Sequence, residues 1–143
     1  MSITTSQQIT RYFETYKAIE VTFTREVIGA TGLLAPHVYL KCIGEQWPCV
    51  VYSSSFEQAK VISTTRTGLM ERLKKGNNIV SLRFSFKDPD KDEPVSLYIG
   101  AKVVGFAPYQ GGQDVSFITI RYTQRPPDDF IEILGRLLEA NMN

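Results

Sequence analysis

The residue types best suited to nucleophilic chemistry in this chain are two cysteines and a single histidine, Cys42, Cys49 and His37. A thiol–imidazole pair requires the imidazole to lie within hydrogen-bond reach of the sulfur. The spacing along an extended strand places His37 roughly 17 Å from Cys42, and no sequence pattern brings Cys49 nearer to it. We therefore predict no catalytic residues and interpret both thiols as buried structural groups.

The same residues do not indicate a metal site. Structural zinc takes four protein ligands, and the two cysteines lack two further ones. The carboxylates between Asp88 and Glu93 stand among lysine and proline residues, which is typical of a solvated loop. The glycines of the second half of the chain do not form a phosphate-binding loop. We expect neither a metal ion nor a cofactor.

Cations and aromatic residues are neighbours on several predicted strands. This combination can bind nucleic acid, so we consider that function. These residues are Arg83, Lys87, Lys102 and Arg121, with Phe84, Phe86, Phe106 and Tyr122. Small barrels bind single strands with such groups, but strand alternation places Phe84 and Phe86 on the face opposite Arg83. With a net charge of +1, the chain also lacks the excess of cations that is typical of such binders. We expect no nucleic-acid partner; a single-stranded nucleic-acid binder and a split-barrel flavin or small-molecule binder are the alternatives.

Length and composition indicate an ordinary globular protein. The chain has 143 residues, of which 43% are hydrophobic and 22% are charged, as expected for one domain spanning residues 1–143. Residues 1–17 are polar and lack the apolar segment of a signal peptide. No apolar run approaches the roughly 20 residues that a membrane-spanning helix needs. We therefore expect a cytoplasmic protein without a membrane span and with reduced thiols.

Residues 37–55 (HVYLKCIGEQWPCVVYSSS) are expected to form the central hairpin of the fold. Two runs of β-branched and aromatic residues flank Gly44, Glu45 and Gln46, a pattern that predicts a tight turn. If Glu45 and Gln46 form a two-residue loop, Cys42 lies opposite Cys49 and Leu40 lies opposite Val51. Apolar residues on both faces of these strands predict that neither face is freely solvated.

Hydrophobic periodicity predicts the remaining elements. Helices are expected over residues 5–17, 64–75 and 128–141, with a short helical turn over 25–30. Strands are expected over residues 19–24, 79–87, 95–106 and 115–123, and residues 56–63 are ambiguous between strand and helical turn. Gly100 and Gly105 predict bulges or bends in the long strand. About five or six strands linked by short turns favour a mainly β (α+β) fold, a small antiparallel split β-barrel with N-terminal, inserted and C-terminal helices.

Four segments together resemble one protein family. They are YFETY at residues 12–16, EVTFT at 20–24, LKCIGEQWPCVVYSSS at 40–55 and RPPDDFIEILGRLLEANMN at 125–143. They are similar to the PilZ-like N-terminal domain (PilZN type) that precedes the PilZ domain in bacterial cyclic-di-GMP receptor proteins. The resemblance implies a PilZ-like barrel that acts as a non-catalytic accessory or adaptor module. It also implies a PilZ domain downstream, outside residues 1–143, or a motility or signalling protein as the partner.

In that family the following PilZ domain and its linker hold the nucleotide, through Arg-x-x-x-Arg and Asp/Asn-x-Ser-x-x-Gly. This chain has the first spacing at Arg121 and Arg125, at the end of the last predicted strand, whereas the family's motif precedes the first strand. It has Asp114 and Ser116 of the second signature, but Thr119 replaces the glycine. The two partial motifs also stand in reversed order. We therefore expect the module itself not to bind the nucleotide, and its partner to contact the polar residues of the terminal helix, Glu132, Arg136 and Asn141.

Overall fold

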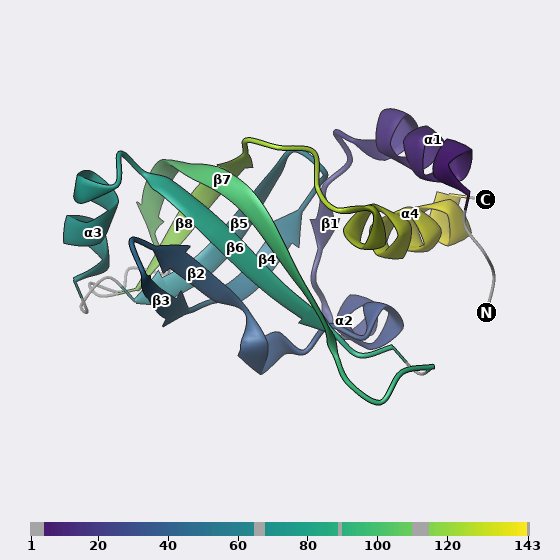
Figure 1. Cartoon of the computed structure of the whole chain (residues 1–143), viewed down its shortest axis with the longest axis horizontal. Coiled ribbons are helices and arrows are strands. Elements are labelled where there is room, and N and C mark those ends of the chain that lie inside the picture. Colours follow the sequence, from purple (N-terminus) through teal and green to yellow (C-terminus); the bar gives the residue numbers. More distant parts are fainter. Residues whose placement is uncertain (1–4, 65–67, 89, 110–114, 143) are drawn as a thin grey trace.

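The computed structural model of the chain describes residues 5–64, 68–88, 90–109 and 115–142. Its helices are α1 (Ser6–Tyr16), α2 (Arg25–Thr31), α3 (Leu69–Lys75) and α4 (Asp128–Met142), with a single 3₁₀ turn η1 (Ala35–His37). Its strands are β1 (Val21–Thr22), β2 (Tyr39–Cys42), β3 (Glu45–Pro48), β4 (Val50–Ser54), β5 (Gln58–Thr64), β6 (Ile79–Phe86), β7 (Val95–Pro108) and β8 (Val115–Tyr122). Figure 1 shows α3 at one end of the sheet and α4 with α1 at the other.

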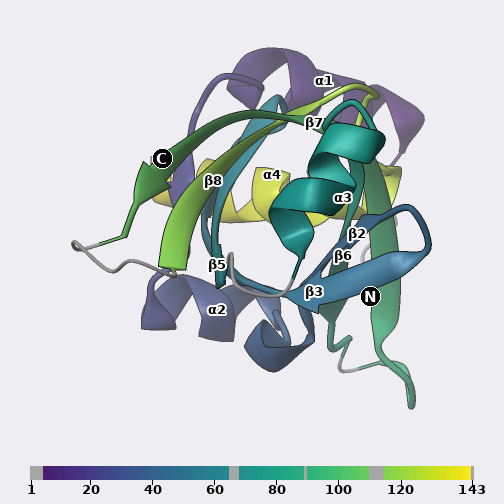
Figure 2. The same ribbon diagram turned by 90° about the vertical axis from the view of Figure 1, so that its left-hand side faces the viewer.

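The strands form one antiparallel sheet in the order β1-β4-β5-β8-β7-β6-β2-β3. The sheet is strongly curved, as Figure 2 shows, but no ladder of described residues joins its two margins, so it is open and not a closed barrel. β3 and β4 follow each other directly in the chain, yet they belong to opposite margins. At this crossing the Cys49 amide donates to the Val38 carbonyl at 3.0 Å, and Ser63 Oγ donates to the Pro48 carbonyl at 3.0 Å. The first bond lies at the open end of the β2–β3 hairpin, and the second crosses the gap in the sheet by joining β5 to the end of β3.

The predicted central hairpin exists, but its predicted register is wrong. Its loop is Ile43-Gly44, both with positive φ (47° and 75°), so Cys42 lies opposite Glu45 and Leu40 opposite Trp47. Two consecutive positive φ values give the turn a twist that matches the flanking strands. The chain after Pro48 leaves this hairpin, so Cys49 and Val51 do not face Cys42 and Leu40. The outer face is also more exposed than predicted, since Val50 is 58% exposed.

Strand alternation predicts the core of the sheet correctly. Val80, Leu82, Phe84 and Phe86 of β6 are all buried, as are the inward residues of β7, namely Leu97, Ile99, Ala101 and Val103. The register of β7 shifts between Val103 and Gly105, which confirms the irregularity predicted there. Gly100 pairs in register with Ser81, so the first of the two predicted alternatives at Gly100, a bulge, is wrong, and the second, a bend, stays a prediction. Among the described residues eight strands form where about five or six were predicted, because residues 45–54 divide into two strands and the segment left ambiguous forms β5, while the strand predicted over 19–24 forms as the shorter β1.

Helices α1 and α4 pack against each other and cover one end of the sheet. Thr5 caps the start of α1, because the Gln8 amide donates to Thr5 Oγ1 at 3.2 Å. Gly135 permits the close approach of the helices: a Cβ there would lie 2.5 Å from Cγ of Tyr12. α4 inserts Phe130 into the core, with its ring centroid 5.1 Å from that of Phe84. Among the described residues, no helix combines the length and the apolar character that crossing a membrane requires.

Candidate functional site

The two thiols and the histidine do not form a reactive group. His37 ends η1, whereas Cys42 and Cys49 are free and buried, and Cys42 Sγ donates to the Arg72 carbonyl at 3.4 Å. Burial raises the pKa of both thiols, and that of Cys49 reaches about 12. The thiolate is the reactive form of cysteine, so both side chains stay inert near neutral pH. Within the described ranges, no cluster of cysteine, histidine and carboxylate side chains is placed to hold a metal ion.

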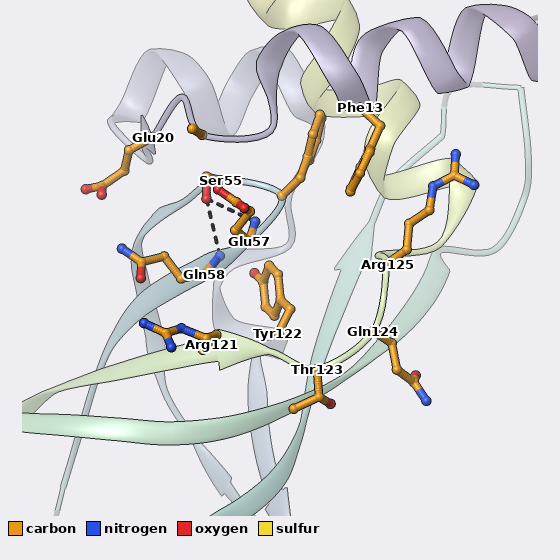
Figure 3. A pocket seen from close by; sticks show the side chains of 12 residues that line it. Phe13, Glu20, Ser55, Glu57, Gln58, Arg121, Tyr122, Thr123, Gln124 and Arg125 are labelled. Carbon is orange, nitrogen blue, oxygen red and sulfur yellow. Dashed lines mark hydrogen bonds between the residues drawn. The ribbon is translucent and has the colours of Figure 1, made fainter.

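A pocket of about 570 Å³ lies where β8 ends, beside α1 and the β4–β5 turn (Figure 3). Its residues come from α1 and the chain after it (Phe13, Ala18, Glu20), from the β4–β5 turn (Ser55, Phe56, Glu57, Gln58) and from the end of β8 and the following chain (Arg121, Tyr122, Thr123, Gln124, Arg125). No cysteine or histidine lines it. The arrangement therefore supplies charge and aromatic surface for binding, without a nucleophile.

Local hydrogen bonds shape the β4–β5 turn that forms one wall of the pocket. Ser55 Oγ accepts from the amides of Glu57 at 3.1 Å and Gln58 at 3.2 Å, a side-chain turn that fixes this corner of the chain. Below it, Tyr122 Oη and Ser54 Oγ share a buried hydrogen bond of 2.7 Å. Burial raises the pKa of the Tyr122 hydroxyl, so this hydroxyl stays neutral near neutral pH and serves as a structural group.

The charges around the pocket are mixed. Arg121 and Arg125 line it together with Glu20 and Glu57. The Arg125 guanidinium lies 5.4 Å from the Phe13 ring centroid, and its Nη2 lies 3.6 Å from Asp128 Oδ1. Figure 3 shows the Arg121 side chain directed toward Gln58 and the Arg125 side chain directed away from it. The two guanidinium groups thus diverge, although both border the same pocket.

The other residues of the predicted nucleotide signatures do not join this pocket. Ser116 lies opposite Ser63 and Pro108, near the start of β8, whereas Arg121 is close to its end. The rise along a strand separates these two positions by roughly 17 Å. Asp114 falls outside the described residues. The structure therefore places Arg121 and Arg125 in the lining of one pocket, with diverging guanidinium groups, and leaves Ser116 elsewhere.

The polar residues predicted to contact a partner lie along α4. Arg136 Nη2 forms an ion pair with Glu132 Oε1 one turn away, and Asn141 Nδ2 donates to the Leu137 carbonyl at 2.9 Å. The Arg136 side chain is 44% exposed and that of Glu132 is 26% exposed. Both are therefore accessible on the helix surface while their charges partly compensate each other.

One arrangement was not predictable from the sequence, and we call it the tyrosine–arginine row: Tyr39, Arg83 and Tyr98. These residues lie opposite one another on the adjacent strands β2, β6 and β7. Arg83 Cζ lies 5.8 Å from the centroid of each tyrosine ring, and Lys41 Nζ lies 5.3 Å from the Tyr98 centroid. The three residues are far apart in sequence, so only the pairing register could have revealed them. For Arg83 and Tyr98 the signal available beforehand was an outward position on a predicted strand, whereas Tyr39 lay on a strand for which neither face was predicted to be solvated.

Comparisons with known proteins identify the family of this chain. A "Cyclic di-GMP binding protein" of Treponema denticola is 44% identical over 144 residues, covering 100% of this chain and 46% of the relative. The chain thus spans about half the length of that relative. The Borreliella burgdorferi PlzA protein, whose crystal structure is in complex with c-di-GMP, superposes with a TM-score of 0.72 at 19% identity, covering 96% of this chain and 57% of PlzA.

The Bacillus subtilis inhibitor of motility MotI/DgrA superposes less closely, with a TM-score of 0.50 at 15% identity over 74% of this chain and 46% of that one. At these identities the two structures show a shared fold. The sequence model of the PilZN3 domain matches residues 7–141. That match extends from α1 through α4, so the chain belongs to the PilZN3 domain family.

Proposed function

We propose that this chain is a non-catalytic accessory module of a cyclic-di-GMP signalling protein, and that the nucleotide site lies outside it. The observation that carries the proposal is the divergence of Arg121 and Arg125, the chain's single pair with the receptor-type spacing among described residues. A phosphate clamp needs guanidinium groups that converge on one anion, because bidentate donation depends on their planar geometry. Here the two groups point to different sides of the pocket.

The surroundings of the two arginines also oppose the binding of an anion. Glu20 and Glu57 line the same pocket, and the Asp128 carboxylate lies beside the Arg125 guanidinium. A cyclic dinucleotide carries a negative charge on each phosphate, so it would have to compete with these carboxylates for the arginines. Interactions between like charges at such sites cost binding free energy. The pocket suits a mixed-charge protein segment better than a dianion.

The comparisons support the signalling role at the level of the family. The Treponema denticola relative is a cyclic di-GMP binding protein, and this chain corresponds to 46% of its length. More than half of that relative therefore lies outside the match, which leaves room for a separate nucleotide-binding domain. The module's part in such a protein would be to pack against that domain and transmit its bound state.

Isothermal titration calorimetry of the chain with cyclic di-GMP tests the proposal. We expect no heat of binding under conditions in which the complete Treponema denticola relative, as the positive control, titrates normally. A dissociation constant on the order of micromolar, about −8 kcal/mol, for the chain alone would overturn the proposal. If binding then disappeared in the double variant Arg121→Ala/Arg125→Ala but not in Arg136→Ala, the pocket would be the nucleotide site.

A further inference from the structure

Positively charged residues are concentrated in the strands, although the net charge of the whole chain is close to zero. Within the eight strands the cations are Lys41, Lys60, Arg83, Lys102 and Arg121, and the single carboxylate is that of Glu45. Glu45 lies opposite the inward-facing Cys42 and pairs with Arg72 of α3, so its charge is directed away from the outer face. The net charge of +1 therefore arises because the acidic residues are concentrated in helices and loops. The outer face of the sheet is basic.

These cations lie on the same outward face as the tyrosine–arginine row. Lys41 lies opposite Ser81, which in turn lies opposite Gly100, so it is one outward position along from the row. Lys102 lies one position further along β7, directly opposite Arg121 of β8. Figure 1 views the sheet from the side of β2, β6 and β7, and no helix passes in front of them. A continuous path thus leads from aromatic rings to exposed cations.

The row itself has features of a binding surface. Tyr98 is 50% exposed, which is high for a large aromatic residue in the middle of a strand. Arg83 Nε is buried and has no hydrogen-bond partner within the described ranges, although Nη2 donates to Ser96 Oγ at 3.4 Å. A guanidinium with an unpaired buried donor is costly for the folded chain, so its position needs a reason beyond sheet pairing.

The combination of rings and cations indicates the class of ligand. Carboxylates of an acidic protein segment would use the cations but gain little from the rings. Single-stranded nucleic acid uses both, because its bases stack on aromatic side chains while its phosphates contact lysine and arginine. Strand spacing and rise give the path from Tyr39 to Arg121 a length of roughly 20 Å. That length suits the low end of the roughly 4–16 nucleotides that one small β-barrel domain binds.

We infer that the outer face of β2, β6, β7 and β8 binds single-stranded nucleic acid without sequence preference. Tyr98 supplies the stacking surface, and Lys41, Arg83 and Lys102 contact phosphates. This function is independent of the proposed signalling role, and among the residues of the path only Arg121 also lines the pocket.

Fluorescence anisotropy of a labelled oligothymidylate of about 12 nucleotides, titrated with the full 143-residue chain, tests the inference. With about three phosphate contacts, the affinity should fall about 20-fold between about 50 mM and about 200 mM salt. The double variant Lys41→Glu/Lys102→Glu should bind at least about 10-fold more weakly. Tyr98→Leu should weaken binding at least about 5-fold, whereas Tyr98→Phe, which keeps the ring, should bind like the wild type.

A matched variant separates the proposed surface from a general charge effect. Lys17→Glu/Lys91→Glu changes the net charge equally at two exposed lysines outside the strands, and it should bind within about 2-fold of the wild type. Absence of any anisotropy change at low salt would overturn the inference, as would equal losses in both double variants. Stronger competition by a poly-glutamate peptide than by unlabelled oligothymidylate would identify an acidic-protein surface instead. A duplex bound as tightly as the single strand would also contradict base stacking on Tyr98.

Discussion

The Cys49 side chain is 6% exposed, and its burial has a consequence for how stability depends on pH. Burial raises the pKa of this thiol from 9.0 to about 12. Above pH 9 the unfolded chain therefore loses the thiol proton while the folded chain keeps it. The folded state binds more protons over this window, so the free energy of unfolding falls as pH rises through it, and the effect is absent below pH 9.

We expect Cys49→Ala to lose part of this pH dependence. Between about pH 9 and about pH 10 the free energy of unfolding of the wild type should fall by about 1 kcal/mol more than that of Cys49→Ala. Urea unfolding followed by tryptophan fluorescence measures both, and the ionisation of Tyr122 in the unfolded chain cancels in the comparison because both proteins contain it. Parallel pH profiles for the two proteins would show that Cys49 is not the group responsible.

The sequence could predict individual residues only where a local rule decides them. Thr5 as the cap of α1 and the buried thiols were predictable, because capping and burial depend on residue type and near neighbours. The Ile43-Gly44 loop was not predictable, since a β-branched residue with positive φ is strongly disfavoured. The structure places the Ile43 side chain against Gly76, where a Cβ would lie 3.3 Å from Ile43 Cδ1. Packing after α3 thus offsets a local conformational cost that no sequence window contains.

At the scale of the secondary-structure elements, the contact of α1 with α4 depends on Gly135, because glycine has no side chain. A Cβ there would lie 2.5 Å from Cγ and 2.6 Å from Cδ2 of Tyr12, and Tyr12 is only 2% exposed, so its ring has little room to move. The helices would have to separate or the ring would have to leave its rotamer. Overpacking of this kind outweighs the helix propensity that alanine adds.

We therefore expect Gly135→Ala to lower the free energy of unfolding by about 1–3 kcal/mol. Gly29→Ala is the matched control, because Gly29 also lies in a helix but a Cβ there would meet no atom within 4 Å. The control should leave stability unchanged or raise it by up to about 1 kcal/mol. Thermal or urea unfolding of the two variants measures the difference. A stabilised Gly135→Ala protein would mean that α1 and α4 pack less tightly than the structure shows.

Elements with clear periodicity were predictable, and elements defined by distant pairing were not. The alternation of Val80, Leu82, Phe84 and Phe86 places β6 and its buried face directly. The division of residues 45–54 into β3 and β4 was hidden, because each half pairs with a different margin of the sheet. The tyrosine–arginine row was hidden for the same reason: Tyr39 and Arg83 meet only once the register of β2 on β6 is known.

At the scale of the whole molecule, the proposed accessory role requires a surface that contacts a companion domain. The exposed side of α4, with Glu132, Arg136 and Asn141, remains our prediction for that surface. α4 is anchored through Phe130 and Leu134, both fully buried, so its outer side is held rigidly on the fold. A rigid helix surface can transmit a contact without rearranging itself.

Binding of the chain to the remaining segment of the Treponema denticola relative, supplied separately, tests this surface. Arg136→Glu should weaken the association at least about 5-fold, equivalent to about 1 kcal/mol, because it places two carboxylates one turn apart in the contact. Arg25→Glu makes the same charge change on an exposed residue of α2 and should have little effect. Surface plasmon resonance gives both values. Equal affinities for wild type and Arg136→Glu would move the contact away from α4.

The passage of the chain at Cys49 from β3 to β4, on opposite sides of the sheet, also affects how the protein folds. The β2–β3 hairpin is local, and hairpins of this kind close within about 1–10 µs. The next strand of the chain cannot extend that hairpin, because β4 must pair with β5 and β1 at the opposite margin. The contact of Tyr12 with α4 adds a closure between distant parts of the chain. Such non-local closure raises the contact order, so we expect folding on the millisecond-to-second scale, with the joining of the two margins among its last steps.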